Sequence, residues 1–118
     1  MLFNCLAVGC GGFIGSVLRY LAGSVVPHDA FPWHTLAINV LGSFVLALVS
    51  GLVLRGAPLD ERLSLLLRVG LCGGFTTMST FSLEAVQLAS STSALAAVGY
   101  VVLTGALCIG ASALGYVL

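Results

Sequence analysis

The sequence predicts an all-α membrane protein with a single domain over residues 1–118 and four membrane-spanning helices. Two observations carry that prediction. The chain is 59% hydrophobic and only 7% charged, with a mean hydropathy of +1.17, so it has too little polar surface to coat a water-soluble globule. Its apolar residues also fall into four segments, each near the roughly 20 residues that cross a bilayer core.

The four segments follow one another through short connectors. The first ends at Pro27, and the second begins at Trp33 and His34, an amphipathic pair suited to the lipid headgroup level. The third follows the charged turn 55–62, and the fourth follows the polar run 89–93. The expected bounds are about 2–26, 33–54, 63–88 and 93–118.

The third segment contains residues that are typical of a loop in water. The stretch 70–84 combines a glycine pair, a cluster of hydroxyl side chains and one carboxylate inside an apolar run. Irregular backbone at membrane depth is tolerated only where protein buries it or where it lines a polar cavity. We therefore expect a helix break near residues 73–77, at a functional centre. Such a break leaves carbonyls near Gly73 that can bind a cation and amides near Thr77 and Met78 that favour an anion.

Polar side chains recur at four-residue spacing on the second and fourth segments, so each set shares one helical face. Such a stripe can be hydrogen-bond glue between helices or the lining of a substrate path, and spacing alone leaves both interpretations open. Recurrence of the stripe beside a broken helix favours a shared wet path. The stripes are Thr35, Asn39 and Ser43 on the second segment, and Tyr100, Thr104, Cys108 and Ser112 on the fourth.

Glu84 and Arg19 are ionisable residues within the apolar segments. Glu84 is the only acid inside one, and an intramembrane ionisable group is by default a functional-site hypothesis. Its alternatives are a position close enough to the helix end to reach water, or a pairing with Arg19 across an interface. Arg19 follows the small-residue pair Gly11 and Gly15, which lets two helices approach closely. A structural role for Arg19 at a helix end or interface is favoured over a direct substrate role.

Charge and motif content exclude several classes of function. The chain has no Lys and a formal net charge of zero, so nucleic acid is not the implied partner. The four cysteines lack C-x-x-C spacing and a nearby His, which argues against a metal or redox site. No nucleotide-binding or catalytic motif is present, so we expect no enzyme.

Charge distribution also bears on assembly. So few arginines flank the connectors that insertion in both orientations is physically plausible. One four-helix chain has too little circumference to enclose a polar path and still bury its polar stripes. We therefore predict a dimer, and dual topology would let the two copies pair antiparallel.

Three stretches carry a family resemblance: GGFIGSVLRY at 11–20, TLAINVLGSF at 35–44 and GLCGGFTTMSTFSLE at 70–84. Together, in this order, they resemble the Fluc (CrcB) fluoride channel family, and the match covers essentially the whole chain. The resemblance implies an antiparallel, dual-topology homodimer in the cell (inner) membrane that exports fluoride passively through two pores. It also implies a structural sodium ion (Na⁺) at the dimer interface.

The resemblance assigns roles to individual residues. It gives the sodium ion to the backbone carbonyls of Gly73 and Thr76 from both subunits. Met78 stands where the family usually has Phe, and a thioether has no aromatic edge, so anion coordination there should differ. The resemblance places Asn39, Met78, Ser79, Thr80, Phe81, Tyr100 and Thr104 along the fluoride pore, and Arg19, Thr35 and Glu84 at a vestibule or interface.

Two alternative functions have the same length and hydropathy. A small dual-topology antiporter of drugs or cations would need a carboxylate in its first helix to exchange protons, and the first segment here offers Arg19 and no acid. A non-transporting assembly subunit would use its glycines and hydroxyls only to pack helices. Fluoride flux from liposomes separates all three functions.

Overall fold

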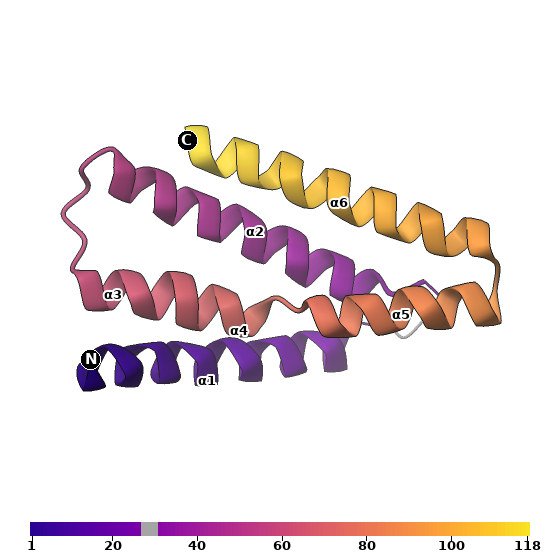
Figure 1. Ribbon diagram of the computed structural model, residues 1–118, viewed down its shortest axis with the longest axis horizontal. Coiled ribbons are helices and arrows are strands. Elements are labelled where there is room, and N and C mark those ends of the chain that lie inside the picture. The colour runs from indigo at the N-terminus through magenta and orange to yellow at the C-terminus, as the bar shows by residue number, and fades with distance from the viewer. Residues whose placement is uncertain (27–30) are drawn as a thin grey trace.

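A computed structural model describes residues 1–26 and 31–118, and every regular element in these two ranges is helical (Figure 1). The predicted connector 27–32 lies partly outside the described residues, which resume at Phe31. Three long helices are α1 (Leu2–Val25), α2 (Trp33–Leu54) and α6 (Ala94–Val117). The third segment is divided into α3 (Glu61–Leu65), the π-helix η1 (Leu66–Cys72), α4 (Gly73–Phe75) and α5 (Met78–Ser91).

Helices α1, α2 and α6 are long and apolar enough to cross a bilayer. This confirms the prediction of an all-helical, multi-pass membrane protein. The large apolar side chains are mostly on the outside, as lipid requires: Phe13 is 73% exposed and Ile109 is 73% exposed. An apolar exterior of this kind is stable in hydrocarbon and unstable in water.

The third segment lies between α1 on one side and the pair α2 and α6 on the other (Figure 1). Helix α2 packs along α6, while α1 packs on η1 and α4 and makes few contacts with α2. Helix α5 then packs on α6, so the third segment contacts α1 with its first half and α6 with its second half. The molecule is elongated, with extents of 47 × 28 × 24 Å.

Glycines allow the close approach of α1 to the third segment. A Cβ atom on Gly15 would collide with the Leu71 carbonyl oxygen, and one on Gly70 would lie 2.6 Å from the Val8 carbonyl oxygen. Both contacts would be far closer than ordinary van der Waals distance, so the two backbones touch directly. The small residues Gly11 and Gly15 of the first segment therefore pack α1 against the third segment of the same chain.

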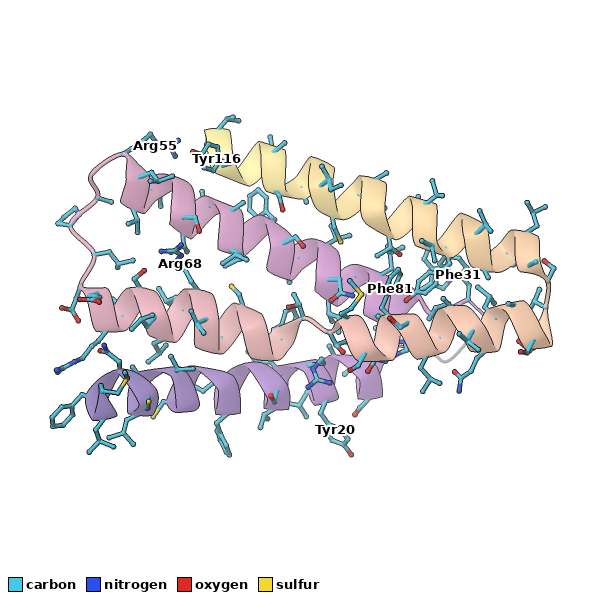
Figure 2. All side chains as sticks on the ribbon, viewed as in Figure 1. Tyr20, Phe31, Arg55, Arg68, Phe81 and Tyr116 are labelled. Carbon is cyan, nitrogen blue, oxygen red and sulfur yellow. The ribbon has the colours of Figure 1, made fainter. Side chains whose placement is uncertain are left out.

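Part of the polar stripe near the C-terminus serves packing between α2 and α6. The Ser112 hydroxyl donates to the Ser43 carbonyl oxygen at 3.4 Å, and Arg55 Nη1 donates to the Tyr116 carbonyl oxygen at 2.8 Å. The bond between Arg55 and Tyr116 joins the two helices at the C-terminal end of α2, and the bond from Ser112 joins them near the middle of α2 (Figure 2). For the Ser112 side chain the glue interpretation of the stripe applies, because its hydroxyl bonds the backbone of α2.

Candidate functional site

The helix is interrupted at Thr76 and Thr77, between α4 and α5. Thr76 has φ −86° and ψ 158°, and Thr77 has φ −150° and ψ 127°, so both are extended. Gly73 is helical, so the non-helical stretch is narrower than the expected 73–77. The Thr77 hydroxyl accepts from the Thr80 amide at 3.2 Å and caps α5, while the Thr76 hydroxyl donates to the Cys72 carbonyl oxygen at 2.9 Å.

Asn39 of α2 holds this interruption in place. Its Oδ1 accepts from the Thr77 amide at 2.8 Å, and its Nδ2 donates to the Thr77 carbonyl oxygen at 3.1 Å. One side-chain amide thus replaces both hydrogen bonds that Thr77 would have made in a helix. Asn39 is only 8% exposed, and it keeps one further N–H and one lone pair for another partner.

Backbone carbonyls gather at the end of α4. Arg19 Nε of α1 donates to the Gly74 carbonyl oxygen at 3.0 Å, which satisfies one orphan acceptor of the helix terminus. Among the described residues, the carbonyls of Gly73 and Thr76 have no hydrogen-bond donor. Gly73 is exposed, and a Cβ there would meet nothing within 4 Å, so the surface of the chain at this residue is open.

These carbonyls fit a hard monovalent cation better than a transition metal. Oxygen ligands without a carboxylate are the chemistry of such ions. Gly73 and Thr76 supply two such carbonyls from this chain. Within the ranges 1–26 and 31–118, no three His, Cys, Asp or Glu side chains come together as a metal cluster.

A first hollow of about 330 Å³ runs along the interruption between α2, the third segment and α6. The Thr104 side chain in its wall is 5% exposed, and its hydroxyl has no hydrogen-bond partner among the described residues. The hollow combines apolar walls with a few polar groups, as ligand sites commonly do. Its lining is Asn39, Gly42, Ser43, Leu46, Arg68, Cys72, Gly73, Thr76, Thr77, Met78, Phe81, Thr104, Gly105 and Cys108.

A second hollow of about 440 Å³ lies on the other side of Thr77, which borders both. It is lined by hydroxyls together with two basic side chains, and no acid is among its lining residues. That composition suits a hydrated anion. The lining is Arg19, Tyr20, Gly23, Ser24, His34, Thr35, Ile38, Thr77 and Thr80.

Glu84 and Tyr100 join α5 to α6. The Tyr100 hydroxyl donates to Glu84 Oε1 at 3.3 Å, while Glu84 Oε2 lies 3.5 Å from His34 Nε2. Tyr100 is fully buried, with Phe81 at 5.1 Å and Phe31 at 5.3 Å between ring centroids (Figure 2). The intramembrane acid is therefore held by His34 and Tyr100, and the hydrogen bond of Arg19 goes to Gly74 instead.

The structure brings most of the expected site residues together around the interruption. Asn39, Met78, Phe81 and Thr104 line the first hollow with Gly73 and Thr76, and Arg19, Thr35 and Thr80 line the second. Tyr100 and Glu84 pack beside Phe81. Two side chains point outward: Met78 is 71% exposed, and Ser79 is exposed with its hydroxyl 3.4 Å from Thr77 Oγ1.

Sequence reasoning used Arg68 only as a topology charge and missed its place in the first hollow. A signal was available, because Arg68, Cys72 and Thr76 are spaced four apart and share one face that leads to the interruption. His34 was likewise read only as a headgroup residue, although it precedes Thr35 of the polar stripe.

Comparison with known proteins agrees with this architecture. The family model described as CrcB-like protein, Camphor Resistance (CrcB), matches residues 6–116. A protein of Ruminiclostridium cellulolyticum named Fluoride-specific ion channel FluC is 42% identical over 120 residues, which cover 99% of this chain and 92% of that protein. Proteins with the same name from Chlorobaculum tepidum and Rhizobium etli are 47% and 48% identical, over 83% and 74% of this chain and 79% and 72% of theirs.

Proposed function

The chain belongs to the CrcB-like family, and we propose that it is a fluoride channel, which lets fluoride leave the cell passively across the cytoplasmic membrane. The observation that carries the proposal is the interruption at Thr76 and Thr77, which borders two hollows whose linings include neutral donors and no acid. Channel conduction needs no covalent chemistry, so the protein acts as a transporter and not as an enzyme.

Neutral donors at the interruption suit a small, strongly hydrated anion. The free N–H of Asn39 and the unpartnered hydroxyl of Thr104 border the first hollow, and the Thr80 hydroxyl borders the second. The N-terminus of the 14-residue helix α5 adds the positive end of a helix dipole. An anion that loses water here gains hydrogen bonds from these neutral groups in its place. We place Met78, Ser79, Phe81 and Tyr100 along the same path.

The direction of flux follows from the membrane potential. An inside-negative potential favours outward movement of an anion by about 2.3 kcal/mol per charge per 100 mV. A passive pore therefore lowers internal fluoride without a coupled ion. The second hollow, with Arg19, Thr35 and the nearby Glu84, serves as a vestibule on this path.

The functional unit in this proposal is an antiparallel homodimer with two pores. The first hollow and the Gly73 carbonyl are open at the surface of one chain, and a second copy closes them. The carbonyls of Gly73 and Thr76 from both copies would hold a sodium ion, whose charge binds the two interrupted helices together. The membrane-spanning segment at the break then lies at the centre of the dimer, where irregular backbone is buried in protein.

Reconstituted protein tests the proposal directly. Liposomes loaded with sodium or potassium fluoride are diluted into fluoride-free buffer, valinomycin sets a potassium diffusion potential, and an ion-selective electrode records efflux. We expect efflux that scales with the potential and that is much slower for chloride in matched liposomes. Efflux no faster than from protein-free liposomes rules the channel out. Efflux that follows a pH gradient and ignores the potential indicates an exchanger.

A further inference from the structure

Arg68 is a partly buried cation on η1, inside the third segment. Figure 2 shows its side chain between the third segment and α2. Its Nη1 donates to the Ser64 hydroxyl at 3.3 Å, whereas its buried Nε has no partner in the described ranges. Within residues 1–26 and 31–118 no carboxylate forms an ion pair with Arg68, and the ion pair in these ranges joins His34 to Glu84. A guanidinium in apolar surroundings without a counter-charge is costly, so this position favours an anion or water beside the side chain.

The position of Arg68 relates it to the proposed path. Arg68, Cys72 and Thr76 occupy successive turns of the third segment and line the first hollow, which continues to Phe81. Across from them the buried Thr104 hydroxyl also lacks a partner. The lining contains no acid. The hollow thus carries the positive charge of Arg68 and two donors without a partner, Arg68 Nε and the Thr104 hydroxyl. Such a combination suits an anion.

Arg68 lies at a shallow depth in the membrane, where water can reach its side chain. It follows the start of α3 at Glu61 by seven residues, so it lies roughly 10 Å along the axis at 1.5 Å per residue. Helical side chains lean toward the N-terminus, and the bond to Ser64 has that direction. The guanidinium can therefore meet a hydrated anion near the level of the α2–α3 connector.

We propose that Arg68 is an anion-binding residue at the connector end of the first hollow, where it takes a small monovalent anion, fluoride, from water into the path. This rests on the proposed channel function and adds to it a residue that concentrates the anion at the mouth of the path. Arg68 concentrates the anion at the mouth, and the neutral donors around Asn39 receive it deeper in the hollow.

Arg62 provides the matched control. It carries the same charge six residues earlier, is exposed, and stacks its guanidinium 4.8 Å from the Phe3 ring centroid, away from the hollow. Arg62→Gln and Arg68→Gln therefore change the net charge near the same connector equally. Only Arg68→Gln removes a charge from the lining, and Arg68→Lys restores that charge without the fork geometry.

Fluoride efflux from liposomes is measured for these variants across a range of internal fluoride concentrations. At low fluoride we expect Arg68→Gln to slow efflux by about fivefold to tenfold, the effect of one unit charge at a partly solvated site. At saturating fluoride its rate should approach that of the parent, Arg68→Lys should recover most of the loss, and Arg62→Gln should match the parent. An Arg68→Gln curve that coincides with the Arg62→Gln curve overturns the proposal.

A binding measurement separates this proposal from the channel function itself. Thermal unfolding in detergent is compared in sodium fluoride and sodium chloride, because an anion that binds the folded state raises its stability. The parent should gain stability in fluoride and Arg68→Gln should not. If the parent shows no efflux but keeps this fluoride effect, the channel function fails and the Arg68 site stands. The site is refuted if fluoride stabilises Arg68→Gln as much as it stabilises the parent. It is also refuted if Arg68→Gln is less stable than the parent by the same amount in both salts, because Arg68 then acts through packing or lipid contact.

Discussion

Replacing Asn39 by Leu is expected to destabilise the fold as well as to slow fluoride flux. Leu has a similar size but removes the bonds of 2.8 and 3.1 Å to the amide and carbonyl of Thr77. Because Thr77 is extended, neither group can return to a helical partner without moving α5. The substitution therefore leaves two backbone groups unsatisfied at a site where Asn39 is 8% exposed.

The size of this effect follows from the two lost partners. A buried donor or acceptor left unpaired costs about 1–3 kcal/mol. Water in the hollows that border Thr77 can partly replace the side-chain amide, so we expect the free energy of unfolding to fall by about 2–4 kcal/mol. Ser43→Ala is the control, because it removes a polar side chain from the same face of α2 and the same hollow without touching Thr77.

The assay is reversible unfolding of the purified protein in mixed micelles with rising denaturing detergent, followed by circular dichroism. Gel filtration reports the dimer, and fluoride efflux is recorded from liposomes. Asn39→Leu should unfold at lower denaturant and conduct less, while Ser43→Ala should stay within about 0.5 kcal/mol of the parent. An Asn39→Leu variant as stable as Ser43→Ala would show that the Thr77 groups do not depend on this side chain. Undiminished flux in a folded Asn39→Leu dimer would remove Asn39 from the pore.

Two further substitutions test the close packing of α1 on the third segment and the role of the exposed Met78. Gly15→Ala should destabilise the protein by about 1–3 kcal/mol or prevent its folding, because the new methyl group meets the Leu71 carbonyl oxygen, whereas Gly9→Ala has open space and should be tolerated. Equal stabilities of the two variants, measured as above, would contradict the close approach of α1. Met78→Phe should fold because Met78 is 71% exposed within the chain, and it should dimerise because the family that the sequence resembles usually has Phe at this position. Loss of the dimer on gel filtration would mean that the register of α5 is wrong. The flux of the variant measures how an aromatic edge at this position affects conduction.

Local pattern predicted most of the helical layout. The apolar segments and the prolines between them indicated where the long helices run, and the four-residue stripes placed Asn39 and Thr104 on faces that meet at one hollow. These features depend on near neighbours in the chain, so periodicity is enough to find them. The sodium site and the dimer depend on a second copy and stay predictions.

Long-range hydrogen bonds explain what the pattern missed. The sequence suggested a break over 73–77, but Gly73 and Gly74 are helical, and a Cβ on Gly74 would lie 2.8 Å from the Gly12 carbonyl oxygen of α1. The extended residues are Thr76 and Thr77, whose peptide groups are matched by Asn39, 38 residues away in sequence. No local propensity contains that partner. Sequence alone therefore indicated the stretch and could not fix the residues at which the helix ends.

The separation of α1 from α2 has a consequence for biogenesis. During synthesis α1 and α2 enter the bilayer first, yet they share few contacts, and the main partner of α2 is α6, the last helix made. Each early helix must therefore be stable in lipid by its own apolar length, which its hydropathy provides. Tertiary structure begins when residues 61–91 insert, and docking of α6 completes it. A truncated chain that stops before the third segment should consist of independent helices that integrate but do not associate.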